Sequence, residues 1–293
     1  MRILVTGGDG FIGRRVAERV RVHGHEPVLF DRTKGSSNET VILGDVRDAD
    51  SVDEAVYHAD GVIHLAGILG TQETVQNPYP SASTNIIGAL NVFESVARHK
   101  TRCVDITVGN YWMLNPYSIT KWCTEKFALM YNAERGTQIA VVRGMNAYGP
   151  GQKVGPVRKV IPTFVCQALA NEDITVYGDG TQKMDMIYVD DLAEILVLAL
   201  LRDHGVYDDV IDAGTGVALS VNEIAETIIS ACGSSSKLKH LPMRPGETPN
   251  DVVCADMSVL KSLWPVTPRS VSDGITPTIE WYRKHQEPLI WTS

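Results

Sequence analysis

The first half of the chain alternates short, almost wholly apolar runs with longer segments of helical periodicity. The apolar runs, rich in Val and Ile, occupy residues 3–6, 27–30, 40–43, 61–64, 102–107 and 138–143. Because these runs are apolar on both faces, they are typical of buried parallel strands. The helical patterns between them cover residues 11–23, 51–57, 83–98 and 117–134. This alternation predicts an α/β fold with a doubly wound, Rossmann-type parallel sheet.

The second half is less regular. Helical patterns cover residues 190–201 and 220–231, and residues 210–212 read as a further parallel strand. Pro and Gly concentrate in residues 149–162 and 241–249, which predicts loops there. The second helix opens with the capping-box pair Ser220 and Glu223.

No internal repeat or obvious flexible linker divides the chain. We therefore expect two interleaved parts rather than two domains in series. The sheet domain takes residues 1–145, and a segment at about 186–214 returns to it. A smaller C-terminal lobe takes most of residues 146–293.

Composition narrows the class of protein. The chain has 293 residues, of which 44% are hydrophobic and 21% charged, an ordinary globular balance. The formal net charge of -8 disfavours a nucleic-acid partner, whose phosphates need a basic face. Five cysteines without a C-x-x-C pair favour a reducing compartment. The eight histidines have no metal-ligand spacing, so we expect no metal.

Hydropathy gives no reason to expect a membrane partner. The apolar run at residues 3–5 is too short for a signal peptide. The most apolar helical segment, residues 192–201, contains Glu194 and is far shorter than a membrane span. We therefore expect a cytoplasmic protein.

A glycine-rich turn follows the first predicted strand. Gly7, Gly10 and Gly13 form the pattern G-x-x-G-x-x-G, and Phe11 and Ile12 open the next helix. Glycine allows a tight turn and lets the backbone approach a pyrophosphate without a Cβ in the way. The free N–H groups of a helix N-terminus then favour the anion. The turn predicts a dinucleotide site.

An acidic residue strengthens this prediction. Asp31 ends the second predicted strand, near the offset of about 20 residues expected for the acid that binds the adenosine ribose. A carboxylate there repels a 2′-phosphate and favours NAD, whereas the adjacent Arg32 leaves NADP open. Asp45 and Val46 follow the third strand, where Asp45 can face the adenine. The alternatives are an incidental carboxylate at Asp31 and an ordinary loop aspartate at Asp45.

Three residues suggest acid–base chemistry. Tyr117 and Lys121 lie four residues apart at the start of a predicted helix, so they share one face. A nearby ammonium favours the phenolate, which can take a proton from a hydroxyl. Thr107 ends the fifth long strand, at the sheet edge where ligands of open α/β folds bind. The alternatives are a surface helix pair and a threonine selected for β-propensity.

With these motifs in place, the chain resembles the NAD-dependent epimerase/dehydratase family, the extended short-chain dehydrogenases. The resemblance covers nearly the whole length. It is carried by residues 6–13, 64–67, 85–88, 117–121, 143–150, 177–180, 188–191 and 244–247.

The resemblance implies roles for further residues. Tyr117 and Lys121 match the catalytic pair and Thr107 their hydroxyl partner, while Asn85 supports the catalytic edge. The strand end under the cofactor comprises Leu65, Ala66 and Gly67. Asn146 and Arg244 match residues that bind the substrate diphosphate, for which a guanidinium is well suited. An Asx-turn at Asn146 and a solvated cation at Arg244 are the alternatives.

Two departures from the family pattern affect the substrate site. Met184 stands where many relatives have an arginine, and Lys183 is a poor geometric substitute. The segment from Thr107 to Tyr117 is also short for the family. The cavity mouth is therefore either more open, or filled by Tyr111 and Trp112.

Together these features predict an NAD-dependent epimerase of a nucleotide sugar, which acts through a transient keto-sugar. No carboxylate follows Thr107 before Tyr117, whereas dehydratases of the family carry acids there. Cys103, Asp105 or a residue of the C-terminal lobe remain as substitutes for these acids. The alternatives are a dehydratase, decarboxylase or reductase on the same scaffold, or a non-catalytic dinucleotide-binding regulator. The resemblance also implies a homodimer.

Overall fold

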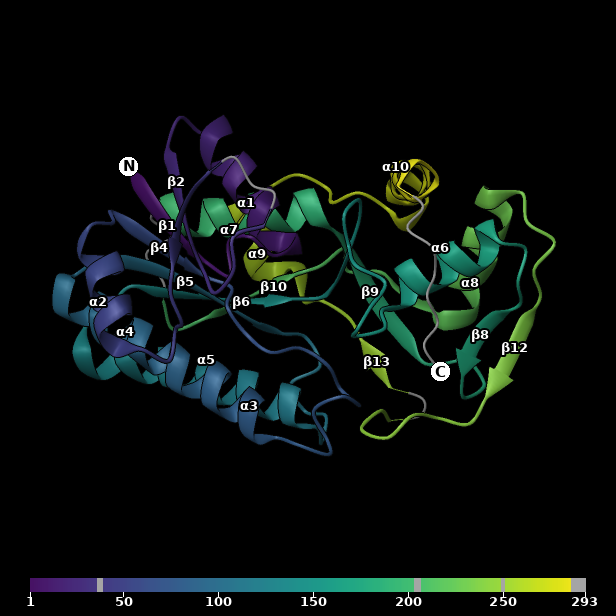
Figure 1. Cartoon of the computed structure of the whole chain (residues 1–293), viewed down its shortest axis with the longest axis horizontal. Coiled ribbons are helices and arrows are strands. Elements are labelled where there is room, and N and C mark those ends of the chain that lie inside the picture. The colour runs from purple at the N-terminus through teal and green to yellow at the C-terminus, as the bar shows by residue number, and fades with distance from the viewer. Residues whose placement is uncertain (36–38, 203–206, 249–250, 286–293) are drawn as a thin grey trace.

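A computed structural model describes residues 1–35, 39–202, 207–248 and 251–285. Its centre is a seven-stranded parallel sheet, on the left of Figure 1, with the order β10-β6-β5-β4-β1-β2-β3. The strands are β1 (Arg2–Thr6), β2 (Glu26–Asp31), β3 (Thr40–Leu43), β4 (Gly61–His64), β5 (Arg102–Val108), β6 (Ile139–Gly144) and β10 (Val210–Ala213). The predicted doubly wound α/β fold is confirmed.

Helices cover both faces of this sheet, which explains the unbroken apolar strands. Ile3 and Val5 of β1 pack on one side, against α1 (Phe11–Val22), α7 (Val189–Leu201) and α9 (Met257–Leu263). Leu4 points to the other side, where α2 (Ala49–Tyr57), α4 (Gly88–His99) and α5 (Pro116–Arg135) lie. Because successive side chains of a strand alternate between faces, each strand needs apolar residues throughout.

Two helices differ from their predicted bounds by more than one residue. Helix α2 begins at Ala49, before the predicted start at residue 51, because the Asp48 carboxylate accepts hydrogen bonds from the Asp50 and Ser51 amides. The helix predicted over 83–98 is regular only in α4. Its first part is a π-helical segment, Ala82–Ile87, which follows the short helix α3 (Tyr79–Ser81). The prediction of a single α-helix there is wrong.

The smaller lobe, on the right of Figure 1, has its own hydrophobic core. Its helices are α6 (Val160–Leu169), α8 (Val221–Cys232) and α10 (Val271–Lys284). Its strands are β7 (Asn146–Tyr148), β8 (Ile174–Tyr177), β9 (Lys183–Tyr188), β11 (Ala218–Ser220), β12 (Leu238–Leu241) and β13 (Val252–Val253). The predicted capping box is present: the Ser220 hydroxyl accepts from the Glu223 amide and the Glu223 carboxylate accepts from the Ser220 amide.

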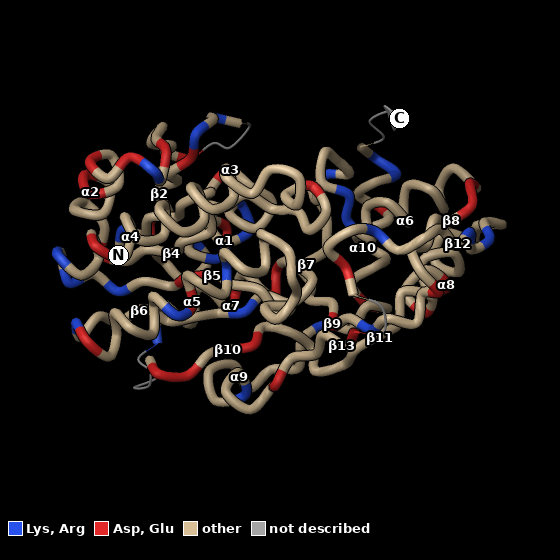
Figure 2. The backbone as a smooth tube through the Cα atoms, turned by 90° about the horizontal axis from the view of Figure 1, so that it is seen from below, with Lys and Arg blue, Asp and Glu red and all other residues tan. Residues whose placement is uncertain are grey.

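The predicted loops are only partly correct. Residues 149–159 are irregular, but residues 160–162 already belong to α6. Residues 242–248 are irregular as predicted, and residue 249 lies outside the described residues. Within the described ranges, no helix is long and apolar enough to cross a membrane. Figure 2 shows Lys and Arg interspersed with Asp and Glu along both halves of the chain.

Candidate active site

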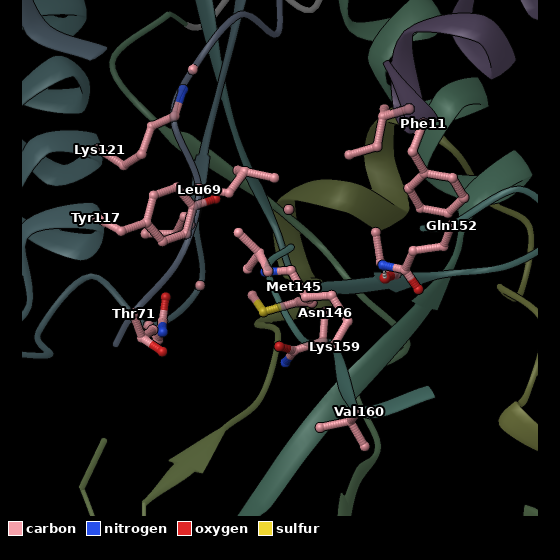
Figure 3. A pocket seen from close by; sticks show the side chains of 18 of the residues that line it. Phe11, Leu69, Thr71, Tyr117, Lys121, Met145, Asn146, Gln152, Lys159 and Val160 are labelled. Carbon is pink, nitrogen blue, oxygen red and sulfur yellow. Dashed lines mark hydrogen bonds between the residues drawn. The ribbon is translucent and has the colours of Figure 1, made fainter. Parts of the chain in front are cut away.

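A cavity of about 530 Å³ lies between the carboxyl edge of the large sheet and the smaller lobe. The residues that the sequence predicts as catalytic, cofactor-binding or substrate-binding all line it except Asp45, and Asn85, predicted to support the catalytic edge, does not line it either. Figure 3 shows Tyr117 and Lys121 on one wall, Phe11 opposite them, and Asn146 and Lys159 toward the lower end. The fold thus brings together side chains that lie far apart in the sequence.

The glycine-rich turn forms one end of the cavity. Gly7 has a φ of 65°, and a Cβ added there would lie 2.9 Å from the Ala66 amide nitrogen. At Gly13, a Cβ would lie 2.5 Å from the Gly7 carbonyl oxygen. Larger residues would therefore displace the turn. Helix α1 starts at Phe11 without a side-chain cap, so its first amides stay available to a bound anion.

Asp31 and Arg32 line this end of the cavity, where β2 ends. The Asp31 carboxylate accepts hydrogen bonds from the amides of Asp9 (3.2 Å) and Thr33 (3.3 Å), which hold it beside the glycine turn. The Asp45 carboxylate is engaged elsewhere. It binds the Arg47 guanidinium at 2.6 Å, and this hydrogen bond lowers the pKa of Asp45 to about 2. Its neighbour Val46 does line the cavity.

The end of β4 passes directly beneath the glycine turn. The amides of Leu65 and Ala66 each donate to the Thr6 hydroxyl oxygen at 3.2 Å. Next to them, the Asn85 side chain binds both the amide and the carbonyl of Ile68, at 2.7 and 3.1 Å.

Asn85 also reaches helix α5. It lies in the π-helical segment, and its amide donates to the Thr120 hydroxyl of α5 at 2.9 Å. A Cβ added at Gly67 would lie 3.1 Å from Asn85 Oδ1 and 3.6 Å from Lys121 Cε. The π-helical segment therefore fixes the distance between the 65–68 backbone and α5.

Local sequence determines where α5 begins. Asn115 caps it by accepting from the Ser118 amide at 2.9 Å, and Pro116 occupies its first position. This start places Tyr117 and, one turn later, Lys121 on the face that meets the cavity. The Lys121 ammonium is buried and donates to the Ile106 carbonyl at 2.8 Å. Burial raises the pKa of Tyr117 to about 12 and lowers that of Lys121.

Thr107 is buried near the end of β5 and lines the cavity. Its hydroxyl has no hydrogen-bond partner within the described part of the chain. Cys103 and Asp105 lie on the same strand, but neither lines the cavity. They are thus not positioned to exchange protons with a bound substrate.

The short segment after β5 does not fill the cavity with aromatic rings. The Tyr111 ring stacks on the Arg143 guanidinium, with the carbon of the guanidinium 4.1 Å from the ring centroid. Trp112 is exposed, and neither aromatic residue lines the cavity. Asn110 and Met113 line it instead. The alternative in which Tyr111 and Trp112 occupy the mouth is therefore wrong.

The lobe contributes the polar far end. Asn146 of β7 donates to the Asp185 carbonyl at 3.1 Å. Arg244 forms an ion pair with Glu247 and stacks on the Tyr177 ring at 4.9 Å. Its Nε is buried and has no acceptor among the described residues. An anion entering here would meet a preformed guanidinium with an unused donor.

Two cations that line the cavity, Arg158 and Lys159, were not predicted from the sequence. Lys159, half-buried just before α6, lines the cavity near Arg244. Burial and Arg244 lower the pKa of its ammonium, while Glu73 and Glu247 oppose that change. Met184 also lines the cavity, so a thioether rather than a cation occupies this part of the wall. The sequence signal was a lone lysine before an apolar helix, which by itself is uninformative.

Among the described residues, no three His, Cys, Asp or Glu side chains are grouped as a metal site. The carboxylates that line the cavity there are Asp31, Glu73, Glu247 and Asp251.

Comparison with known proteins agrees with this arrangement. The chain is 32% identical to a UDP-N-acetyl-alpha-D-glucosaminuronate decarboxylase of Bacillus cytotoxicus, over 97% of this chain and 98% of the relative. It is 28% identical to a dTDP-glucose 4,6-dehydratase of Streptomyces niveus, over 99% of this chain and 96% of the relative.

Among solved structures, a UDP-glucose 4-epimerase of Thermotoga maritima with UDP-glucose superimposes with a TM-score of 0.89. Its sequence identity is 26%, and the match covers 97% of this chain and 99% of that one. These relatives carry out different reactions on one scaffold. The profile of the NAD dependent epimerase/dehydratase family matches residues 3–214, and the chain belongs to this family.

Proposed function

We propose that the protein is an NAD-dependent epimerase of a nucleotide sugar. The observation that carries this proposal is the composition of the cavity wall around Tyr117. Among the described residues the Thr107 hydroxyl there has no hydrogen-bond partner, and the sequence has no carboxylate between Thr107 and Tyr117. Elimination needs an additional acid and base beside the reacting carbons, whereas epimerisation needs one acid–base group and a substrate that can turn.

The residues of the glycine turn suit NAD. The space over Gly7 and Gly13, the uncapped start of α1 and the Asp31 carboxylate form a cradle for a pyrophosphate and a ribose. The proposed contacts also include the residues that line the cavity beside this turn. They are Gly10, Phe11, Ile12, Arg32, Val46, Leu65, Ala66 and Gly67. The engagement of Asp45 with Arg47 argues against a contact between Asp45 and the adenine.

The catalytic roles follow from the charges at the start of α5. When bound, NAD supplies the hydride acceptor and a positive charge close to the phenol. Burial alone keeps Tyr117 protonated, since it raises the pKa to about 12. Lys121 provides a fixed ammonium on the same helix face, which opposes this effect and favours the phenolate. Tyr117 then takes the proton of a sugar hydroxyl, while Thr107 donates a hydrogen bond to the same oxygen.

The far end of the cavity suits a diphosphate. We propose that Arg244 and Lys159 bind its charge and that Asn146 binds one of its oxygens. The unused Arg244 Nε and the cavity-facing Lys159 support this assignment. Lys159 supplies the charge that Met184 does not.

We also propose which segments of the chain bind the cofactor and which bind the substrate. Residues 1–145, with the segment at about 186–214, bind NAD, and most of residues 146–293 bind the sugar nucleotide. The return of α7 and β10 to the large sheet supports this division. The five free cysteines suit a reducing compartment such as the cytoplasm.

A homodimer is proposed from the outer face of α5. Ile119, Trp122 and Met130 are exposed on this helix, at a spacing that forms one stripe. A second copy would cover these side chains. Light scattering of the purified protein and of Trp122→Glu tests this, with a dimer expected for the native chain and a monomer for the variant.

The decisive experiment is a panel of UDP- and dTDP-sugars incubated with the protein and followed by NMR. The proposal expects a C4 epimer in equilibrium with its substrate. Accumulation of a 4-keto-6-deoxy sugar would contradict it. A second candidate is decarboxylation of a nucleotide-linked uronic acid, which is favoured by the 32% identity to a decarboxylase. Release of CO₂ from a uronate in the same panel would establish that reaction instead. Binding of NAD without conversion of any sugar would point to a regulator.

A further inference from the structure

Three titratable side chains lie buried side by side beneath α5, outside the cavity. His64 of β4 and Asp105 of β5 are paired in register, so their side chains leave the same face of the sheet. Both are 0% exposed, and Lys121 above them is 2% exposed. Buried ionisable groups of this kind are costly unless they pair with one another.

Hydrogen bonding determines which His64 nitrogen carries the proton. The Thr6 hydroxyl oxygen accepts from the amides of Leu65 and Ala66, so its own hydrogen is free to donate. The nearest acceptor is His64 Nδ1, at 2.7 Å. Burial lowers the pKa of His64 to about 3, so the ring is neutral at physiological pH. Nδ1 therefore accepts, and the ring proton must be on Nε2.

This leaves a buried donor beside buried acceptors. His64 Nε2 has no partner within the described residues, and the same holds for both carboxylate oxygens of Asp105. Thr124 also lies beside Asp105 and lowers its pKa, while the Thr124 hydroxyl donates to the Lys121 carbonyl at 2.9 Å. The register of β4 and β5 places the His64 donor and the Asp105 acceptors on neighbouring strands, directly across from each other.

Asp105 also acts on Lys121. Its carboxylate opposes the effect of burial and raises the pKa of the Lys121 ammonium. Burial raises the pKa of Asp105 to about 6, and Lys121 lowers it. The other titratable groups near Asp105 are Cys103 on its own strand and Glu125 on α5. Glu125 is already paired with Arg143 at 2.8 Å, which leaves Lys121 to Asp105.

We propose that Asp105 is a positioning residue, the buried counter-ion of Lys121, held in place by a hydrogen bond from His64 Nε2. The chain Thr6–His64–Asp105–Lys121 then links the strand before the glycine turn to the catalytic helix. Asp105 keeps the ammonium charged in a site that would otherwise favour its neutral form. The inference rests on the proposed function only for the importance of Lys121.

The first test is made on the native protein and needs no activity. Long-range ¹H–¹⁵N NMR, assigned with His64→Gln, reports the tautomer of His64. The proposal expects protonated Nε2, unprotonated Nδ1, and an Nε2 proton protected from exchange. A ring protonated on Nδ1 would overturn it, because Nε2 would then have no hydrogen to give to Asp105.

The second test measures the Lys121 ammonium by NMR of labelled lysine, assigned with Lys121→Met. In Asp105→Asn its pKa should fall by about one unit or more, as expected for loss of an adjacent opposite charge. Cys103→Ala, two residues away on the same strand, should leave it unchanged. An unchanged Lys121 pKa in Asp105→Asn, or an equal fall in Cys103→Ala, would overturn the proposal.

Activity adds a separate readout. If the proposed function is correct, Asp105→Asn should lower kcat roughly tenfold with little change in KM, and should move the pH profile of kcat. Absence of sugar conversion by the native protein would count against the proposed function alone. The two NMR tests would still decide the inference about Asp105.

Discussion

The side-chain amide of Asn115 donates a hydrogen bond of 3.2 Å to the carbonyl of Gly246. The same side chain caps α5 through its oxygen. One residue thus joins the helix that carries Tyr117 to the lobe segment that carries Arg244. Asn115 therefore has two separable effects, one on stability and one on the substrate site.

Two substitutions at Asn115 separate these effects. Serine keeps a capping oxygen but is too short to reach Gly246, whereas alanine removes both bonds. We expect Asn115→Ser to raise KM for the sugar nucleotide while stability is retained. We expect Asn115→Ala to lose about 1 kcal/mol of unfolding free energy as well. Urea unfolding and steady-state kinetics measure the two quantities. Equal KM values for the serine variant and the native protein would show that the Gly246 bond is dispensable.

Tyr117→Phe should nearly abolish turnover and leave cofactor binding intact. The substitution removes the only ionisable atom of the side chain and keeps its ring. General acid–base catalysis contributes about 10²–10⁴-fold, so a loss of that order is expected. Rate measurements and NAD titration of the same preparation check both parts. A variant with more than about half of the native rate would rule out Tyr117 as the acid–base group.

Asp31 should control the choice of cofactor. Asp31→Asn removes the charge that repels a 2′-phosphate and should narrow the preference for NAD over NADP. The measurement is titration of both cofactors into protein freed of bound nucleotide. Tighter binding of NADP by the native chain would instead assign control to the neighbouring Arg32.

Lys159→Met should weaken binding of the sugar nucleotide and leave NAD binding unchanged, because Lys159 lines the far end of the cavity. Loss of one charge-assisted hydrogen bond is worth about 1.5–3 kcal/mol, which corresponds to a rise in Kd of roughly 10- to 100-fold. Lys153→Met is the matched control, since Lys153 is exposed and does not line the cavity. Similar Kd values for the two variants would contradict the role of Lys159.

His64 should make the protein sensitive to acid. Burial lowers its pKa in the folded state from 6.5 to about 3. The unfolded state therefore binds more protons below pH 6.5, and folded-state stability falls as the pH drops from there toward 3. At about 1.4 kcal/mol per pKa unit, the loss reaches about 3 kcal/mol near pH 4.

The matching experiment is urea unfolding of His64→Gln and the native protein between pH 7 and 4. The variant has no group to protonate at this position, so its stability should fall less steeply with acidification. Protonation of Asp105 acts in the opposite direction, and making the same comparison in an Asp105→Asn background removes that contribution. His58→Gln, at an exposed position, should behave as the native protein does. Parallel curves for His64→Gln and the native chain would contradict the assignment.

The half of the fold that contains the large sheet was predictable because the apolar pattern of its strands and the helical periodicity between them are both strong. Runs such as residues 61–64 are apolar on both faces, and the structure buries every residue of β4. The smaller lobe offers weaker signals. Helix α6 has Pro162 in its first turn, where the sequence predicts a loop, and α10 contains Pro277, which disfavours a helix. Tertiary packing against β9 and α8 outweighs that local preference.

The candidate site was predictable where a motif determines the backbone. The glycine turn and the start of α5 fall into this class, because the close packing at position 13 admits only glycine and Pro116 fixes φ at the first helical position. Contacts between distant segments leave no such signal. The engagement of Asp45 by Arg47, the stacking of Tyr111 on Arg143 and the approach of Lys159 to the cavity appear only after folding.

The return of β10 to the large sheet has a consequence for motion. The chain passes from sheet to lobe after β6, comes back between β9 and α7, and leaves again after β10. The large sheet and the smaller lobe are thus joined by several short connecting segments. Two such parts cannot rotate about one hinge, as two domains on a single linker do, because all the connecting segments must bend together. Exchange of a ligand buried between them then requires small concerted sliding, which is slow. A cofactor that is regenerated in each cycle has no need to leave, and this connectivity would retain it through many turnovers.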